Sequence, residues 1–273
     1  MIRRPAVAGQ FYSGSVSGLK EEVEGCIEPG LQKKDALGVV CPHAGFMYSG
    51  KVAGAVYSRI NIPDTFVILG PNHHGVGADF SIMTEGVWRM PFGEVKVDSL
   101  LGKEIFKRTG HLKEDPFAQE MEHSLEVQIP FMQYFSKDFQ IVPISLRHFA
   151  PEKNFLKICE DIGAGIASAI SSQKSKVTIV ASTDLTHYQP QEVAQRNDKA
   201  ALDSILAMDA ERLFSEVRKK DISMCGFAPV AATLTACKRL GAKKAEIIKY
   251  MTSGDTTGDY SAVVGYGGAI ISI

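Results

Sequence analysis

A short apolar run followed at once by two adjacent histidines is the feature that most constrains this chain. Residues 65–69 read Thr-Phe-Val-Ile-Leu, and residues 70–75 continue as Gly-Pro-Asn-His-His-Gly. Such a run indicates a strand covered on both faces, as in a parallel sheet, and we expect it to end at Gly70 and Pro71. Open α/β sheets bind ligands outside the carboxyl ends of their strands. We therefore predict that the loop carrying His73 and His74 forms one wall of a functional site.

Two other predicted strands also end in polar loops. Residues 37–41 are followed by Pro-His-Ala-Gly, which includes His43, and residues 176–181 are followed by a loop that contains Asp184 and His187. A predicted helix over residues 51–60 connects the first of these strands to the strand at 65–69, which is the pattern of a βαβ unit. We expect the two histidine loops to lie side by side at one end of the sheet.

The rest of the chain predicts a single α/β domain over residues 1–273. No repeat, low-complexity segment or linker divides it, and this length can bury a sizeable core. A helix is expected from Glu122 onward despite Pro130. We expect a mixed, mainly parallel sheet with helices on both faces. Further strands are predicted at 79–84, 86–90, 94–98, 139–146, 245–251 and 262–271, and further helices at 17–27 (with Ser17 as N-cap), 99–108, 155–171, 193–208, 210–219 and 228–240.

The composition argues against nucleic acid and membranes as partners. The formal net charge is -1, so no overall basic field points to nucleic acid or to an anionic membrane. No apolar run approaches the roughly 18 to 20 residues of a membrane span, and the residues after Met1 lack the apolar core of a signal peptide. The five cysteines never form a Cys-x-x-Cys pair, which favours reduced thiols. We expect a cytoplasmic protein that binds a small molecule or peptide, with no nucleic-acid or membrane partner.

Histidines at the predicted loops are candidates for metal binding. A single histidine such as His43 is more often explained by a bond to a loop carbonyl, but two adjacent imidazoles at His73 and His74 are hard to explain by packing. Neighbours in an extended loop point in opposite directions. One of the two is therefore expected to bind a metal, and the other to contact substrate or a carboxylate.

Other polar residues are candidates for acid–base or ligand roles. Asp184 and His187 form a candidate acid–base pair, with helix capping by Asp184 as an equal alternative. Glu122 and His123 either line a cleft or cap a helix. Cys225 precedes a predicted helix and is a candidate thiolate ligand or nucleophile, although most free cysteines act as small buried hydrophobes.

Together these motifs resemble the Memo family, which comprises the mediator of receptor-tyrosine-kinase-driven cell motility and its archaeal and bacterial relatives. The resemblance implies a fold similar to that of class III extradiol dioxygenases, in which two histidines and a glutamate hold non-haem Fe(II). It spans nearly the whole chain. The motifs are Ala-Gly-Gln-Phe-Tyr at 8–12, Pro-His-Ala-Gly at 42–45, Gly-Pro-Asn-His-His at 70–74, Glu-His-Ser at 122–124, Ser-Thr-Asp-Leu-Thr-His at 182–187, Cys-Gly at 225–226 and Val-Gly-Tyr at 264–266.

The resemblance also implies roles for individual residues. His43 and His74 match the two histidine ligands, and Cys225 takes the place of the carboxylate. The expected cofactor is a divalent metal, Fe(II) first, with Cu or Zn as alternatives because a thiolate shifts the metal preference. The candidate catalytic residues are His187, Asp184 and His123, and the candidate substrate-binding residues are His73, Glu122 and Tyr48.

Three functions are compatible with these residues. The first is a redox metalloprotein with a dioxygenase-like site that acts on oxygen or a small organic substrate. The second is a non-catalytic module that binds a phosphopeptide or small anion, as animal relatives are reported to do with phosphotyrosine. The third is a zinc-dependent hydrolase with Asp184 or Glu122 as the base.

Overall fold

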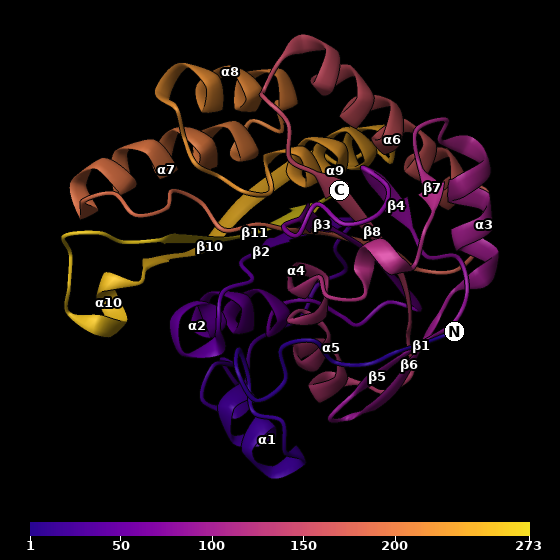
Figure 1. Ribbon diagram of the computed structural model, residues 1–273, viewed down its shortest axis with the longest axis horizontal. Helices are drawn as coiled ribbons and strands as arrows, with labels where there is room; N and C mark the ends of the chain where they lie inside the picture. Colours follow the sequence, from indigo (N-terminus) through magenta and orange to yellow (C-terminus); the bar gives the residue numbers. More distant parts are fainter.

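Four parallel strands form the middle of the sheet in the computed structural model, which describes all 273 residues (Figure 1). Every residue of β2, β3 and β9 is buried, which explains why their sequences are mostly apolar. The predicted βαβ unit is present, but β9 lies between its two strands. The two histidine loops are therefore separated by one strand at the sheet edge. The order of the four strands is β8 (Gln140–Arg147), β3 (Thr65–Asn72), β9 (Val177–Ser182) and β2 (Gly38–Cys41).

Antiparallel pairs widen the sheet on both sides, so the mixed, mainly parallel sheet expected from the sequence is present. Beyond β2 lie β11 (Gly265–Ser272) and then β10 (Lys244–Thr252), each antiparallel to its neighbour. Beyond β8 lie β6 (Gly93–Val97), β5 (Val87–Met90) and β1 (Ile2–Arg3), and the short β4 (Phe80–Ile82) and β7 (Lys113–Glu114) complete the sheet.

Helices cover both faces of the sheet, as predicted (Figure 1). Alternate residues of β3 divide between two cores, with Val67 and Leu69 on one face and Phe66 and Ile68 on the other. The first face packs against α3 (Ser99–Arg108), α6 (Lys153–Ser171), α7 (Gln191–Leu206), α8 (Ala210–Lys220) and α9 (Phe227–Arg239). The second packs against α1 (Val16–Glu24), α2 (Phe46–Tyr57) and α5 (Ile129–Phe135).

Several element boundaries differ from the sequence prediction, and three of these differences have a clear physical reason. β3 does not end at Gly70 but continues to Asn72, and it pairs with β9 only as far as Leu69, so Pro71 lies where one side of the strand is free. The helix expected from Glu122 is divided into α4 (His123–Glu126) and α5, because Pro130 is tolerated only in the first turn of a helix.

The third difference is at α1, whose N-cap is Ser15 rather than Ser17. Its hydroxyl accepts a hydrogen bond from the backbone N–H of Gly18 at 3.2 Å. The remaining short elements are η1 (Phe117–Gln119) and α10 (Gly254–Thr257).

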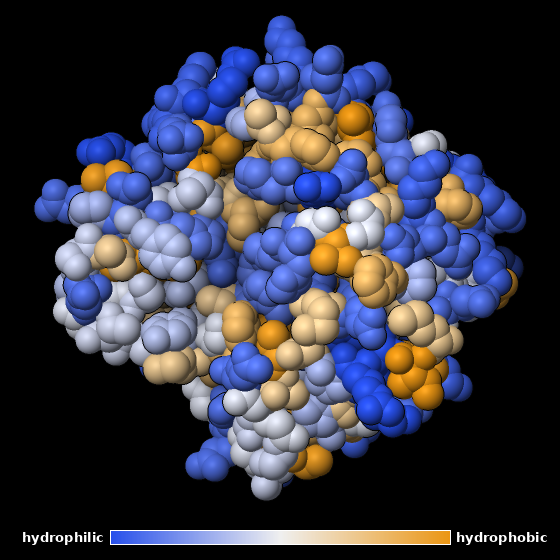
Figure 2. Space-filling view, in the orientation of Figure 1, coloured by the Kyte–Doolittle hydropathy of each residue, from blue (hydrophilic) through white to orange (hydrophobic).

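The surface is of mixed character. Figure 2 shows hydrophilic residues over most of one face, with hydrophobic residues in several separate areas. Among the helices, none combines the length and apolar character that crossing a membrane requires. All five cysteines are free.

Candidate metal centre

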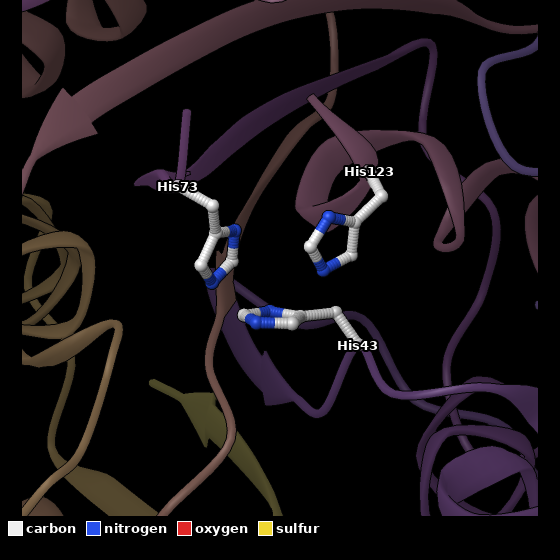
Figure 3. A group of neighbouring side chains, drawn as sticks. All are labelled: His43, His73 and His123. Carbon is white, nitrogen blue, oxygen red and sulfur yellow. The ribbon is translucent and has the colours of Figure 1, made fainter. Parts of the chain in front are cut away.

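Three histidine rings converge at the carboxyl edge of the sheet (Figure 3). His43 follows β2, His73 follows β3, and His123 is the first residue of α4. One ligand nitrogen from each ring lies within 4.8 Å of the other two. The ring centroids are 4.5 to 5.5 Å apart. The three imidazoles are thus close enough together to share one metal ion.

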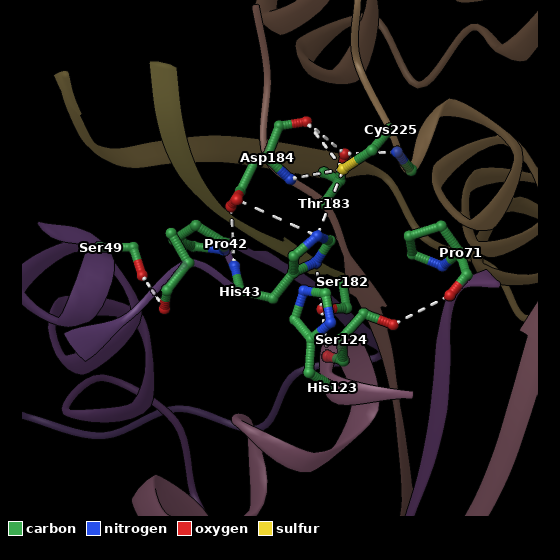
Figure 4. Close-up of polar contacts among 12 residues, drawn as sticks. Pro42, His43, Ser49, Pro71, His123, Ser124, Ser182, Thr183, Asp184 and Cys225 are labelled. Atoms are coloured by element: carbon green, nitrogen blue, oxygen red, sulfur yellow. Dashed lines mark hydrogen bonds and ion pairs between the residues drawn. The ribbon is translucent and has the colours of Figure 1, made fainter. Parts of the chain in front are cut away.

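A chain of hydrogen bonds determines which nitrogen of His43 is free (Figure 4). Nδ1 of His43 lies 2.9 Å from Oγ of Ser182, and that hydroxyl donates its one proton to the carbonyl of Ser124 at 2.6 Å. Nε2 of Gln128 also donates to the same hydroxyl oxygen. Ser182 can therefore only accept from His43, so Nδ1 carries the ring proton. Nε2 keeps its lone pair and is the nitrogen left for a metal.

Glu122 fixes His73 in the same tautomer. Its carboxylate accepts the backbone N–H of His73 at 2.7 Å and lies 2.9 Å from Nδ1 of the ring. Burial alone would raise the pKa of Glu122, but the hydrogen bond from His73 and the charges of His73 and His123 lower it to about 2. The ionised carboxylate only accepts, so His73 donates from Nδ1 and Nε2 is free. Carboxylates commonly orient metal-binding histidines in this way.

This position changes the role expected for Glu122. Its side chain is fully buried behind the histidines and does not line the cleft in front of them. The predicted contact with substrate is therefore not supported, and Glu122 instead orients His73. It also lies 3.6 Å from Nδ1 of His123 and caps α4 through the N–H of Ser124.

Burial lowers the pKa of two of the three histidines, His43 and His123. Together with the charge of neighbouring His73, it holds the pKa of His43 well below its ordinary value. Burial and the charge of His43 lower the pKa of His123 to about 4. A metal ligand must be an unprotonated imidazole, so both residues are ready to bind metal at neutral pH.

The geometry selects His73, not His74, from the adjacent pair. His73 turns inward because Glu122 holds both its backbone and its ring. Both residues are exposed, but only His73 belongs to the histidine group and to the cleft lining. The predicted assignment of His74 as the ligand and His73 as the substrate contact is thus the reverse of what the geometry favours.

Cys225 and Asp184 lie against His43 (Figure 4). Sγ of Cys225 is 3.3 Å from Nε2 of His43, the nitrogen that is free for a metal. Asp184 accepts the backbone N–H of His43 at 2.8 Å, and its other oxygen is 4.0 Å from Nε2. Burial raises the pKa of the Asp184 carboxyl and, together with the charge of Asp184, that of the Cys225 thiol. Cys225 thus lies beside His43, but it does not belong to the group of three histidines whose ligand atoms lie within 4.8 Å of one another.

A cleft of about 1020 Å³ opens in front of the three histidines. Its lining includes Asp184, His187 and Tyr48, as the sequence suggested for residues that act on a substrate. Nδ1 of His187 lies 2.8 Å from the carbonyls of Leu185 and Ser223, which leaves Nε2 without a bond to the protein. The cleft can therefore bring a substrate to the histidine group and to the unbonded Nε2 of His187 at once.

One wall of the cleft was not predicted from the sequence. Residues 9–14 line it, and the ring of Phe11 lies 4.8 Å from that of His123. Glu126 anchors this segment by accepting the Tyr12 hydroxyl at 2.5 Å and forming a buried ion pair with Arg3. The Gly-rich opening with two aromatic residues was the available signal, but nothing local indicates a partner more than 100 residues away.

The chain matches one family model and several archaeal proteins over nearly its whole length. The family model described as Memo-like protein matches residues 3–270. A MEMO1 family protein of Methanothermobacter thermautotrophicus is 42% identical over 278 residues, covering 97% of this chain and 99% of the relative. Those of Nitrosopumilus maritimus and Sulfolobus acidocaldarius are 43% and 41% identical, covering 98% and 97% of this chain and 98% of each relative. Because these matches run almost from end to end, the protein belongs to the Memo family.

Proposed function

We propose that the protein holds one divalent metal ion with His43, His73 and His123 and uses it to oxidise a small organic molecule. The observation that carries this proposal is the convergence of three imidazole nitrogens beside an open cleft. In His43 and His73 the other ring nitrogen is already occupied, by Ser182 and Glu122 respectively. The donors are therefore oriented before any ion arrives.

The donor set suits Fe(II), and it also suits Cu and Zn. Cys225 lies outside the histidine group but is placed to share an ion with His43, because a nitrogen and a sulfur that share one ion lie roughly 3.6 Å apart at the tetrahedral angle. The observed separation from Nε2 of His43 is 3.3 Å. Bound Fe(II) would supply one-electron chemistry with oxygen. The cleft lies on the side of the site that the protein leaves open.

The acid–base work is assigned to His187. Its Nδ1 proton is held by the carbonyls of Leu185 and Ser223, so Nε2 is available to take a proton from a substrate hydroxyl in the cleft. Asp184 is the second acid–base candidate, because its raised pKa allows it to give or take a proton closer to neutral pH. The sequence predicted a catalytic role for His123. We assign it as a metal ligand instead, because its ring belongs to the histidine group.

A second candidate is zinc-dependent hydrolysis. Three imidazoles with an open position are a ligand set of catalytic zinc, and Asp184 provides a carboxyl with a raised pKa in the cleft. Glu122 does not serve as the base, since it is fully buried and has a pKa of about 2. Binding of a phosphopeptide or small anion is not adopted. The cleft is lined by Glu22, Asp184 and Asp259 and by no lysine or arginine, so it presents no fixed cation to a phosphate.

Metal retention by matched variants tests the proposal. Protein without an affinity tag is loaded anaerobically with Fe(II), passed through a desalting column and analysed for metal. His43→Ala, His73→Ala and His123→Ala are each expected to lose most of the metal, whereas His74→Ala retains as much as the wild type. Equal retention by all four variants would overturn the metal site. Loss in His74→Ala with retention in His73→Ala would restore the assignment made from the sequence.

The choice between the two reactions needs a separate measurement. Stoichiometric iron in anaerobically purified protein, with no ester hydrolysis by the zinc-loaded form, supports the redox function. Stoichiometric zinc, together with hydrolysis of 4-nitrophenyl acetate that disappears in His73→Ala, would favour the hydrolytic function over the redox function.

A further inference from the structure

Tyr266 is the second residue of β11 and lies at the same edge of the sheet as the histidines. β11 runs antiparallel to β2, with Ala269 opposite Val40, so its first residues lie beyond the carboxyl end of β2. The backbone N–H of Gly265 donates to the carbonyl of Thr186 at 2.9 Å, which pins this end of β11 to the loop that carries Asp184 and His187.

The two glycines on either side of Tyr266, Gly265 and Gly267, are closely packed against neighbouring side chains. An added Cβ would lie 1.8 Å from Oδ2 of Asp198 at Gly265, and 2.8 Å from Cδ2 of Leu202 at Gly267. Such close packing holds the residue between them in one place. The packed backbone of residues 265–267 therefore fixes the position of the Tyr266 side chain beside the cleft.

The hydroxyl of Tyr266 has no partner in the protein. The residue is 2% exposed and lines the cleft, yet its hydroxyl makes no hydrogen bond. The other two buried tyrosines are bonded: Tyr12 donates to Glu126 at 2.5 Å and Tyr57 to Gln128 at 3.0 Å. Four side-chain oxygens of the protein are fully enclosed without a hydrogen-bond partner, and the Tyr266 hydroxyl is not one of them. It therefore faces the cleft, where a ligand can complete its hydrogen bonding.

The surroundings of this hydroxyl indicate the kind of ligand. Phe11, Tyr48 and Tyr188 contribute aromatic side chains to the same cleft, which suits an aromatic ring. No lysine or arginine lines the cleft, whereas Glu22, Asp184 and Asp259 do, so an anionic ligand is disfavoured. Burial, and then the charge of Asp184, raises the pKa of Tyr266, so at neutral pH its hydroxyl is protonated and can donate.

We propose that Tyr266 donates a hydrogen bond to an oxygen of an uncharged aromatic ligand bound in the cleft beside the three histidines. The assignment rests on the proposed function, because it takes the cleft as the substrate site. Tyr266 contributes specificity by selecting ring compounds that carry a hydroxyl or carbonyl oxygen over the same rings without it.

Equilibrium dialysis of the metal-free protein with two matched probes tests this assignment. 4-Chlorophenol carries the oxygen, and chlorobenzene is the same ring without it. The wild type is expected to bind 4-chlorophenol more tightly. Tyr266→Phe weakens 4-chlorophenol binding about five- to tenfold and changes chlorobenzene binding less than about twofold. Tyr260→Phe is the matched control, since Tyr260 is 48% exposed and does not line the cleft, and it leaves both affinities unchanged.

Two readouts separate this role from a structural one. The thermal midpoint of Tyr266→Phe is expected to equal or exceed that of the wild type, whereas Tyr57→Phe, which loses a buried hydrogen bond, lowers it. A lowered midpoint in Tyr266→Phe, equal weakening of both probes, or no preference for 4-chlorophenol in the wild type would overturn the assignment. Failure of the wild type to retain metal would instead overturn the proposed function, and the dialysis result would stand because it uses metal-free protein.

Discussion

Oγ of Ser182 accepts a hydrogen bond from Nδ1 of His43 at 2.9 Å, and this contact leaves Nε2 as the free nitrogen of the ring. Ser182→Ala removes the acceptor and leaves a buried N–H unpaired. We expect metal affinity to fall about 10- to 100-fold and the free energy of unfolding to fall by about 1–3 kcal/mol. Competition with a chelator and urea denaturation measure the two effects. Ser175→Ala is the control because Ser175 is exposed, and equal behaviour of the two variants would contradict the role of Ser182.

Glu122 orients His73 through both of its oxygens, so Glu122→Gln is expected to disturb the site without changing its shape. One acceptor oxygen becomes an amide donor, and an N–H of His73 or Ser124 loses its partner. Metal affinity should fall about 10- to 100-fold. Glu120→Gln, an exposed change two residues earlier, should leave the affinity as it is. Chelator competition on both variants decides the point; indistinguishable affinities would show that Glu122 does not orient a ligand.

The metal-free protein is expected to lose stability in mild acid. The pKa of His123 is about 4 in the folded protein against 6.5 for the free side chain, so the unfolded chain binds more protons between these values. Stability therefore falls as the pH drops through this window, by about 2 kcal/mol between pH 7 and pH 5 for His123 alone. The lowered pKa of His43 acts in the same direction. Urea denaturation at both pH values checks this.

The non-titrating variant His123→Asn isolates this contribution. Its loss of stability between pH 7 and pH 5 should be smaller than that of the wild type by about 2 kcal/mol. An identical loss in the two proteins would mean that His123 titrates normally in the folded state.

Gly70 lets α4 approach β3 closely, so Gly70→Ala is expected to displace His123. An added Cβ would lie 2.4 Å from Oγ of Ser124 and 2.8 Å from Cδ2 of Leu125. Overpacking of this kind costs about 1–3 kcal/mol. Metal affinity should fall with it, because the side chains that must move belong to α4 and directly follow His123. Gly110→Ala is the control, since nothing lies within 4 Å of its added Cβ. Full stability and full metal retention in Gly70→Ala would argue against this packing.

Cys225 is expected to bind the metal through sulfur, given its 3.3 Å separation from Nε2 of His43. A coordinating thiol is deprotonated by the ion, whatever its pKa in the metal-free protein. Cobalt(II)-loaded protein should therefore show a thiolate-to-metal charge-transfer band in the near ultraviolet, and Cys225→Ser should abolish it. Cys237→Ser, a change of another buried cysteine, should retain the band. Absence of the band in the wild type would leave the histidines as the protein's donors.

Much of the fold was predictable because local patterns encode burial. The continuous apolar runs at β3 and β9 identified strands covered on both faces, and the polar residues after them identified the functional edge of the sheet. The insertion of β9 between β2 and β3 was not predictable, because a βαβ pattern does not say which strand fills the gap between its two strands. Pro71 was mistaken for a strand end because its tolerance depends on where β9 stops pairing.

By itself, the sequence determined that this is an α/β protein with histidines and Asp184 at the carboxyl edge of a buried sheet. Only the tertiary structure decided which histidine of the adjacent pair turns inward and which nitrogens are free. Glu122 is 49 residues from His73, and Ser182 is 139 residues from His43. Periodicity records whether a residue is buried in its own element. The orientation of a ring depends on hydrogen-bond partners that folding brings from distant parts of the chain.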